Sequence, residues 1–303
     1  MASSMSPADA KKAMVAQDFY LKAEKAVTPG FLGRILRTSS DQYADARSKF
    51  ILAANNYKAA KLPSKAAEAF LKAAECAHLE KNPYDEADAY RNAASCFRNL
   101  SSESVIQYLK MSIDLNMSDG RFSTAAKQTK EAAEEYEKEK DVANAIEMYT
   151  DAANLYEGEK STSASNGCLL KAAQFKANLE KYSESISLFN KVADRSLDNG
   201  LLKWSVKEYY LNAGLCYLAN NDLVGCQLAL DSFKDKDPSF HLQRECDFLE
   251  KLVKAVEQYN SESLTEAVNQ FDCISPLDPW RVSLLLKIKR MLQKEEAATS
   301  SVL

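Results

Sequence analysis

A motif of about twenty residues repeats along this chain, and it constrains the fold more than any other feature. Most copies have a large apolar residue followed, three and four residues later, by two small ones. The small pairs are Ala53-Ala54, Ala73-Ala74, Ala93-Ala94, Ala132-Ala133, Ala152-Ala153 and Ala172-Ala173. Residues at these spacings share one face of an α-helix. Each copy therefore predicts one helix, of about 14 residues, followed by a short connection.

Two neighbouring copies predict a helical hairpin of about 40 residues. Small residues at the contact let adjacent helices approach closely, and each hairpin buries its apolar face only against its neighbours. The expected connections include Lys61-Leu-Pro63, Lys81-Asn-Pro83 and the segment that ends at Gly120. We therefore expect an all-α chain, a solenoid of the right-handed type built from hairpins similar to tetratricopeptide repeats.

The repeat fades after about residue 230, where Asp237-Pro238 is typical of a helix start. Helices are expected over 239–259, 261–271 and 280–296. The sequence thus predicts two domains, a solenoid over 1–235 and a C-terminal helical bundle with a short flexible tail over 236–303.

Composition and motifs exclude several function classes. The formal net charge of −4 disfavours a general nucleic-acid binder, because no excess of basic residues covers a face. No apolar leader or membrane-spanning stretch is visible, which favours a cytoplasmic protein. The 7 cysteines form no CxxC pair and the 2 histidines are far apart in sequence, so we expect neither disulfides nor a metal site. No phosphate-binding loop or nucleophile motif points to an enzyme, a cofactor or a small-molecule substrate.

The connector at about 27–40 is unusually apolar for a segment between two helices. Its large apolar residues are Phe31, Leu32, Ile35 and Leu36, and two arginines lie among them. Two interpretations remain open from the residues alone. The segment either folds back on the helix ends, or it is exposed and contacts a membrane surface.

Basic side chains recur near the repeats. They are Arg121, Lys127, Lys171, Lys203, Lys207 and Arg244. Each one alone is typical of a solvated surface residue. Because the units are periodic, several of them could also align into a cationic surface for an acidic macromolecular partner.

Several ordered stretches resemble the alpha-type soluble NSF attachment proteins. They include Ser118-Asp-Gly-Arg-Phe-Ser-Thr-Ala-Ala-Lys127, Leu201-Leu-Lys-Trp-Ser-Val-Lys207 and Phe271-Asp-Cys-Ile-Ser-Pro-Leu-Asp-Pro-Trp280. The resemblance runs over essentially the whole chain, in order and with few gaps. It implies an adaptor that binds assembled SNARE four-helix bundles and recruits the hexameric ATPase NSF. The family stimulates ATP-driven disassembly of these bundles, and the hydrolysis of ATP belongs to the partner.

The resemblance also assigns residues. It places Arg121, Lys127, Lys171, Lys207 and Arg244 on the SNARE-binding side. It places Phe31, Leu32, Ile35 and Leu36 at a peripheral membrane contact, and Glu257 and Leu303 at the contact with NSF. Gly167 stands where the family usually has a lysine. The alternative reading, which rests on the repeat alone, is a generic peptide-binding scaffold or co-chaperone similar to tetratricopeptide proteins.

Overall fold

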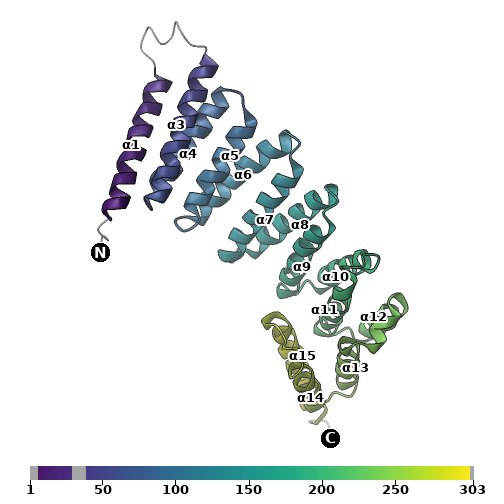
Figure 1. Cartoon of the computed structure of the whole chain (residues 1–303). Coiled ribbons are helices and arrows are strands. Elements are labelled where there is room, and N and C mark those ends of the chain that lie inside the picture. The colour runs from purple at the N-terminus through teal and green to yellow at the C-terminus, as the bar shows by residue number, and fades with distance from the viewer. Residues whose placement is uncertain (1–5, 29–38, 301–303) are drawn as a thin grey trace. The chain divides into compact units, whose positions relative to one another are not determined.

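The computed structural model describes residues 6–28 and 39–300, and these ranges contain fourteen α-helices and no β-strand (Figure 1). The predicted all-α class is therefore confirmed. The chain divides into two compact units, Met1–Ser165 and Asn166–Leu303. The division into domains at about residue 235 stays a prediction.

In the first unit, consecutive helices pack side by side as antiparallel hairpins (Figure 1). They are α1 (Pro7–Val27), α3 (Ser39–Ala59), α4 (Pro63–Leu79), α5 (Pro83–Phe97), α6 (Ser102–Ser118), α7 (Phe122–Lys138) and α8 (Val142–Gly158). The next helix, α9 (Thr162–Asn178), begins in this unit and continues in the second. Helices α4, α6, α7, α8 and α9 are each 17 residues long, so they exceed the expected length and the connections are correspondingly shorter.

The small pairs of the repeat lie at the contacts between helices. All six pairs are at most 1% exposed. The large residues beside them, for example Phe50 and Phe70, are each 2% exposed. Since alanine adds little width, neighbouring helices can approach to about 8–10 Å and the aromatic rings fill the space beside them. The pattern that predicted the hairpins is thus the pattern that forms their core.

A shared turn ends most of the helices. The second residue after the helix has a positive φ, and the N–H of the residue that follows it donates to the carbonyl oxygen five residues back at 2.8–3.0 Å. The positive-φ residues are Lys61, Lys81, Gly120, Lys140, Lys160, Glu180, Asn221 and Tyr259. This bond satisfies carbonyl groups that the helix end leaves without a partner. A left-handed conformation costs a non-glycine residue roughly 1–2 kcal/mol, so packing of the hairpins must hold these turns in place.

The second unit has a different arrangement. After α9 it contains α10 (Tyr182–Leu197), the 3-10 turn η1 (Lys203–Ser205), α11 (Val206–Ala219) and α12 (Leu223–Lys236). A second 3-10 turn, η2 (Pro238–Leu242), leads to α13 (Arg244–Glu257), α14 (Ser261–Asp272) and α15 (Pro279–Ser300). Helix α11 is central, because it contacts α10, α12, α13 and α15.

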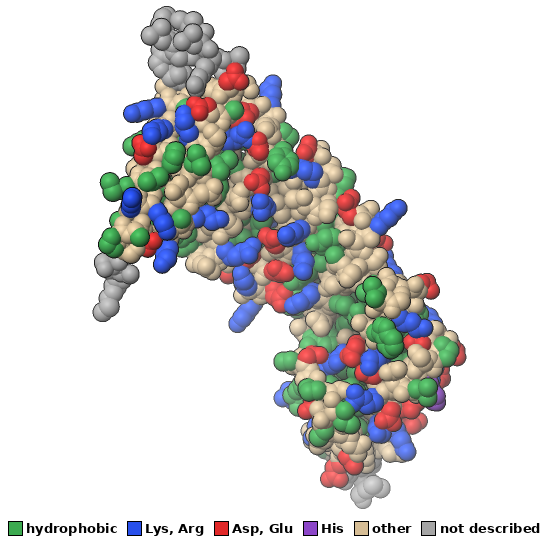
Figure 2. Space-filling view, in the orientation of Figure 1, with side chains coloured by type: hydrophobic (Ala, Val, Ile, Leu, Met, Phe, Trp, Pro, Cys, Tyr) green, Lys and Arg blue, Asp and Glu red, His purple; other side chains and the backbone are tan. Residues whose placement is uncertain are grey.

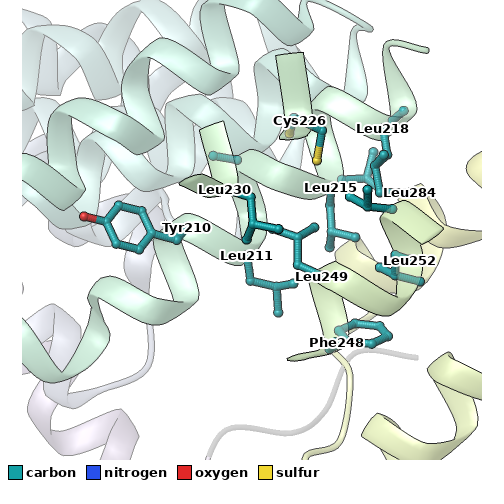
Figure 3. Packing of buried hydrophobic residues seen from close by; sticks show 14 of the residues in the cluster. Tyr210, Leu211, Leu215, Leu218, Cys226, Leu230, Phe248, Leu249, Leu252 and Leu284 are labelled. Atoms are coloured by element: carbon teal, nitrogen blue, oxygen red, sulfur yellow. The ribbon is translucent and has the colours of Figure 1, made fainter. Parts of the chain in front are cut away.

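A single apolar core joins these helices. Leu211 and Leu215 of α11, Leu249 and Leu252 of α13, and Leu284 of α15 are all buried and converge in it (Figure 3). Polar contacts fix the last helix over this core. The indole Nε1–H of Trp280 donates to the Gln174 carbonyl oxygen at 3.2 Å, and Arg281 donates to Asn212 at 2.8 Å and pairs with Glu208. The predicted C-terminal helical bundle is confirmed.

The prediction of one continuous helix over 239–259 is wrong for its first residues. The chain instead forms η2, becomes extended at Gln243 (φ −87°, ψ 148°) and only then begins α13. The carboxylate of Asp237 caps η2 by accepting from the N–H and the hydroxyl of Ser239. Phe240 is fully buried and packs edge-on against Tyr210, with ring centres 5.2 Å apart. Burial of this ring favours the turn over a continuous helix.

Candidate partner-binding surfaces

In the first unit, a cavity of about 370 Å³ lies between α5 and α7 and carries two of the predicted cationic residues. Arg121 directly precedes α7, after the positive-φ turn at Gly120. Its guanidinium lies 4.5 Å from the centre of the Tyr84 ring, and its Nε lies 2.9 Å from the Asp119 carboxylate. Stacking and ion pairing hold this side chain in one position, so little conformational entropy remains to be lost on binding.

Lys127 lines the same cavity from the second turn of α7 and is exposed. Within the described ranges, its ammonium has no ion-pair partner. By contrast, Lys130 on the same helix lies 3.7 Å from Glu134, and Arg91 across the cavity pairs with Asp88. Figure 2 shows basic and acidic side chains interspersed over the visible face of this unit. The local cationic character therefore comes mainly from Lys127, because Arg121, like Arg91 and Lys130, is paired with a carboxylate.

In the second unit, the predicted cations differ in their surroundings. Lys171 is exposed on α9, and its ammonium lies 5.9 Å from the centre of the Phe175 ring. Lys207 on α11 is half-buried, and its Nζ lies 3.0 Å from the carboxylate of Glu245, a residue that is 2% exposed. Lys207 therefore neutralises a buried charge and ties α11 to α13.

Arg244 is the exposed first residue of α13 and the chain neighbour of Glu245. The ion pair with Lys207 therefore brings Arg244 and Lys207 to the same corner of this unit. Arg244 also lines a cavity of about 500 Å³ whose lining includes Phe248 and Phe271. These rings stack with centres 4.3 Å apart.

Sequence reasoning missed two exposed apolar side chains in the second unit. Leu201 is 89% exposed and Trp204 is 79% exposed, on the connection that leads to α11. Lys203 lies between them, with its ammonium 4.0 Å from the carboxylate of Asp237. An exposed tryptophan beside leucine is typical of a contact surface rather than of a solvated connection. The sequence feature that could have revealed this surface is Trp204, which stands between Lys203 and Lys207 at a break in the helical pattern.

The remaining predicted contacts fall partly outside the described residues. Glu257 is exposed and is the last residue of α13, so a partner can reach its carboxylate. Leu303 and the predicted membrane-contact residues (Phe31, Leu32, Ile35 and Leu36) lie outside the described ranges. Among the helices that the structure describes, none has the length and apolar character that crossing a membrane requires.

The cysteines behave as core residues with one exception. Six of them are buried, and Cys273 is exposed after α14. Burial raises the pKa of the Cys216 and Cys226 thiols to about 12. Thiols with pKa values so far above neutrality are poor nucleophiles, which fits structural and not catalytic roles.

Stacked antiparallel helical hairpins define a helical repeat protein. More specifically, the chain belongs to the soluble NSF attachment protein (SNAP) family, whose model matches residues 14–293. It is 35% identical to an alpha-soluble NSF attachment protein of Vitis vinifera over 92% of this chain and 95% of the relative.

Two further relatives match over similar lengths. A beta-soluble NSF attachment protein of Bos taurus is 36% identical over 94% of each chain. A probable vesicular-fusion protein of Schizosaccharomyces pombe is 35% identical over 90% of this chain and 94% of that protein. These relatives are named as attachment and fusion proteins and not as enzymes, which agrees with the expectation of an adaptor.

Proposed function

We propose that this chain is an adaptor that binds assembled SNARE four-helix bundles and recruits and stimulates the NSF ATPase to disassemble them. The observation that carries the proposal is the match to NSF attachment proteins over nearly the whole length of both chains. Such an adaptor acts from the cytoplasm and associates peripherally with membranes. It supports vesicle fusion and intracellular protein transport by returning SNARE proteins to a usable state.

The charges of the described surfaces support a contact with an acidic helical bundle. Lys127, Lys171 and Arg244 are exposed cations that can pair with carboxylates on a partner. Arg121 is held against Tyr84 and can form bidentate hydrogen bonds from a fixed position. Lys207 contributes differently, because its pairing with Glu245 positions the start of α13.

Apolar contacts would add affinity that charge alone does not provide. Leu201 and Trp204 lose their exposed area to water when a partner covers them, which favours binding by about 25 cal/mol per Å² of apolar surface. In the same proposal, the Phe31–Leu32 segment touches the membrane, and Glu257 and Leu303 contact NSF.

The first experiment measures disassembly of a purified SNARE bundle by NSF and ATP, with and without this protein. Strict dependence on the chain supports the adaptor function. Binding to neither the bundle nor NSF would reject it and return the chain to the alternative of a peptide-binding scaffold. Competition between a folded SNARE bundle and an unfolded peptide separates these two functions directly.

Charge reversal tests the basic surface. Lys127→Glu should weaken binding to the bundle roughly 5- to 30-fold, because an exposed attraction of up to about 1 kcal/mol becomes a repulsion of similar size. Lys11→Glu is the matched control, since it makes the same charge change at an exposed position of α1 that does not line this cavity. Binding of wild type should also fall as salt rises. Equal effects of the two variants would mean that only net charge matters and that the assigned surface is wrong.

The membrane contact needs its own comparison. Phe31→Ser combined with Leu32→Ser should lower disassembly of SNARE bundles anchored in liposomes, and it should leave disassembly of soluble bundles nearly unchanged. Equal loss in both settings would show that this segment supports the fold or the SNARE contact and not the membrane contact.

A further inference from the structure

Three potential metal ligands meet where η2 joins α13 in the second unit. Cys246 and Glu250 are four residues apart on α13 and therefore share one helical face. His241 belongs to η2, and the extended residue Gln243 turns the chain between them. One ligand atom from each of His241, Cys246 and Glu250 lies within 4.8 Å of the other two, and the Cys246 Sγ lies 3.9 Å from the Glu250 Oε1.

We propose that His241, Cys246 and Glu250 form a binding site for a zinc-class divalent cation, with water as the fourth ligand. The chemistry of the three ligands determines the class of metal. A thiolate and an imidazole favour Zn²⁺ and similar borderline ions, whereas Mg²⁺ and Ca²⁺ require shells of oxygen ligands. When the metal binds, the thiol proton of Cys246 is released to solvent and an S–metal bond replaces the S–H bond.

The distances between the three ligand atoms fit a tetrahedral zinc site if these atoms move slightly closer together. Bonds of about 2.0–2.3 Å at tetrahedral angles separate neighbouring ligand atoms by roughly 3.3–3.6 Å. Closing the present separations needs movements of about 1 Å or less at each ligand. Cys246 is fully buried and fixed by α13, whereas His241 is exposed and Glu250 is partly exposed. The two more accessible side chains can therefore rotate toward a sulfur atom that is already in place.

Lys234 competes with a bound metal for the Glu250 carboxylate. The ammonium of Lys234 on α12 lies 2.7 Å from the Glu250 Oε1. This contact holds the carboxylate beside the cysteine when no metal is bound. A bound cation must share Glu250 with Lys234 or displace it, and like-charge repulsion then weakens the metal site. Lys234 is thus expected to limit the affinity rather than to abolish it.

Metal binding would link η2 to α13, which the backbone connects only through the extended residue Gln243. The ligands flank Arg244 in the sequence, so an occupied site would fix the turn that carries this exposed cation. The buried Phe240 ring already anchors η2 from its other side. The proposal stands independently of the SNARE adaptor function, since it rests only on the side chains of η2 and α13.

Cobalt provides a direct probe, because a Co²⁺–thiolate bond gives a charge-transfer absorption that carboxylates and imidazoles do not. The full-length chain, reduced and metal-free, is titrated with Co²⁺. We expect one equivalent to produce this band, Zn²⁺ to remove it and Mg²⁺ to leave it unchanged. Cys246→Ser should eliminate the band. Cys273→Ser, the matched control that removes the exposed thiol, should retain it.

Two further variants test the other ligands by calorimetry with Zn²⁺. His241→Ala changes an exposed side chain and should weaken binding at least tenfold without changing the helical circular dichroism. Lys234→Gln removes the competing ammonium and should tighten binding several-fold. The proposal is overturned if no thiolate band appears, if the band depends on Cys273, or if His241→Ala binds Zn²⁺ like wild type. Binding by Lys234→Gln that is no tighter than wild type would contradict the ligand role of Glu250.

Discussion

Replacement of Gly214 by alanine tests a close approach of α11 and α13 in the second unit. An ideal Cβ on Gly214 would lie 2.5 and 2.6 Å from the two methyl carbons of Leu249 and 3.1 Å from its Cγ. Leu249 is fully buried on α13, so it cannot move into solvent. Overpacking of this kind costs about 1–3 kcal/mol, whereas alanine gains about 1 kcal/mol over glycine within a helix. We expect Gly214→Ala to lower the free energy of unfolding by about 1 kcal/mol (range 0–2).

Gly167→Ala is the matched control, because Gly167 also lies within a helix of the second unit. A Cβ added there meets no atom within 4 Å, and the position is exposed. This variant should therefore be more stable than wild type by up to about 1 kcal/mol. The helix-propensity term is common to both variants. The difference between their unfolding free energies therefore isolates the steric strain at Leu249, about 1–3 kcal/mol.

Urea unfolding followed by tryptophan fluorescence measures this unit selectively. The chain has 2 tryptophans, Trp204 and Trp280, and both lie in the second unit. Trp280 packs against Phe189 with ring centres 5.7 Å apart, so its emission should change when the core opens.

A double variant completes the test. Leu249→Val removes the methyl groups that crowd Gly214, so Gly214→Ala should cost less in that background, with a coupling of about 1 kcal/mol or more. If Gly214→Ala stabilises the chain as much as Gly167→Ala does, α11 and α13 are not in close contact at this point and the packing argument fails.

Three other predictions concern backbone strain and thiol chemistry. Gly120→Ala should lower stability by about 1 kcal/mol through its φ of 73° alone, since its Cβ meets no atom within 4 Å; urea unfolding followed by circular dichroism measures this. A thiol reagent at pH 8 should label the native chain at Cys273 and reach the buried cysteines only after unfolding, and labelling that survives Cys273→Ser would contradict the burial. Because the raised pKa values of Cys216 and Cys226 keep both thiols protonated in the native state, the unfolded state releases these protons first as pH rises above their ordinary value of 9.0. Stability should then fall by up to about 1.4 kcal/mol per pH unit for each thiol, and Cys216→Ala should flatten that slope in urea titrations repeated from pH 8 to 10.

Local patterns determined the helical framework. Alanine pairs such as Ala73-Ala74 identified the buried faces, and breaks such as Lys81-Asn-Pro83 identified the connections, because helix formation and capping depend on residues a few positions apart. The same reasoning failed at 239–259, where burial of the Phe240 ring against Tyr210 outweighs a locally helical sequence. That contact joins residues about thirty positions apart, which no local period encodes.

For the charged residues, too, the sequence determined some properties and only the tertiary structure decided others. The sequence alone identified the basic positions and the family that they resemble, and the family is confirmed. It did not distinguish Lys207, which neutralises buried Glu245, from Lys127, which faces solvent. The sequence also did not predict that His241 lies close to Cys246. The number of histidines carries no information about the turn that places His241 beside α13. Residue type and period are properties of the chain, whereas the partner of each side chain is set by distances that exist only after the helices have packed.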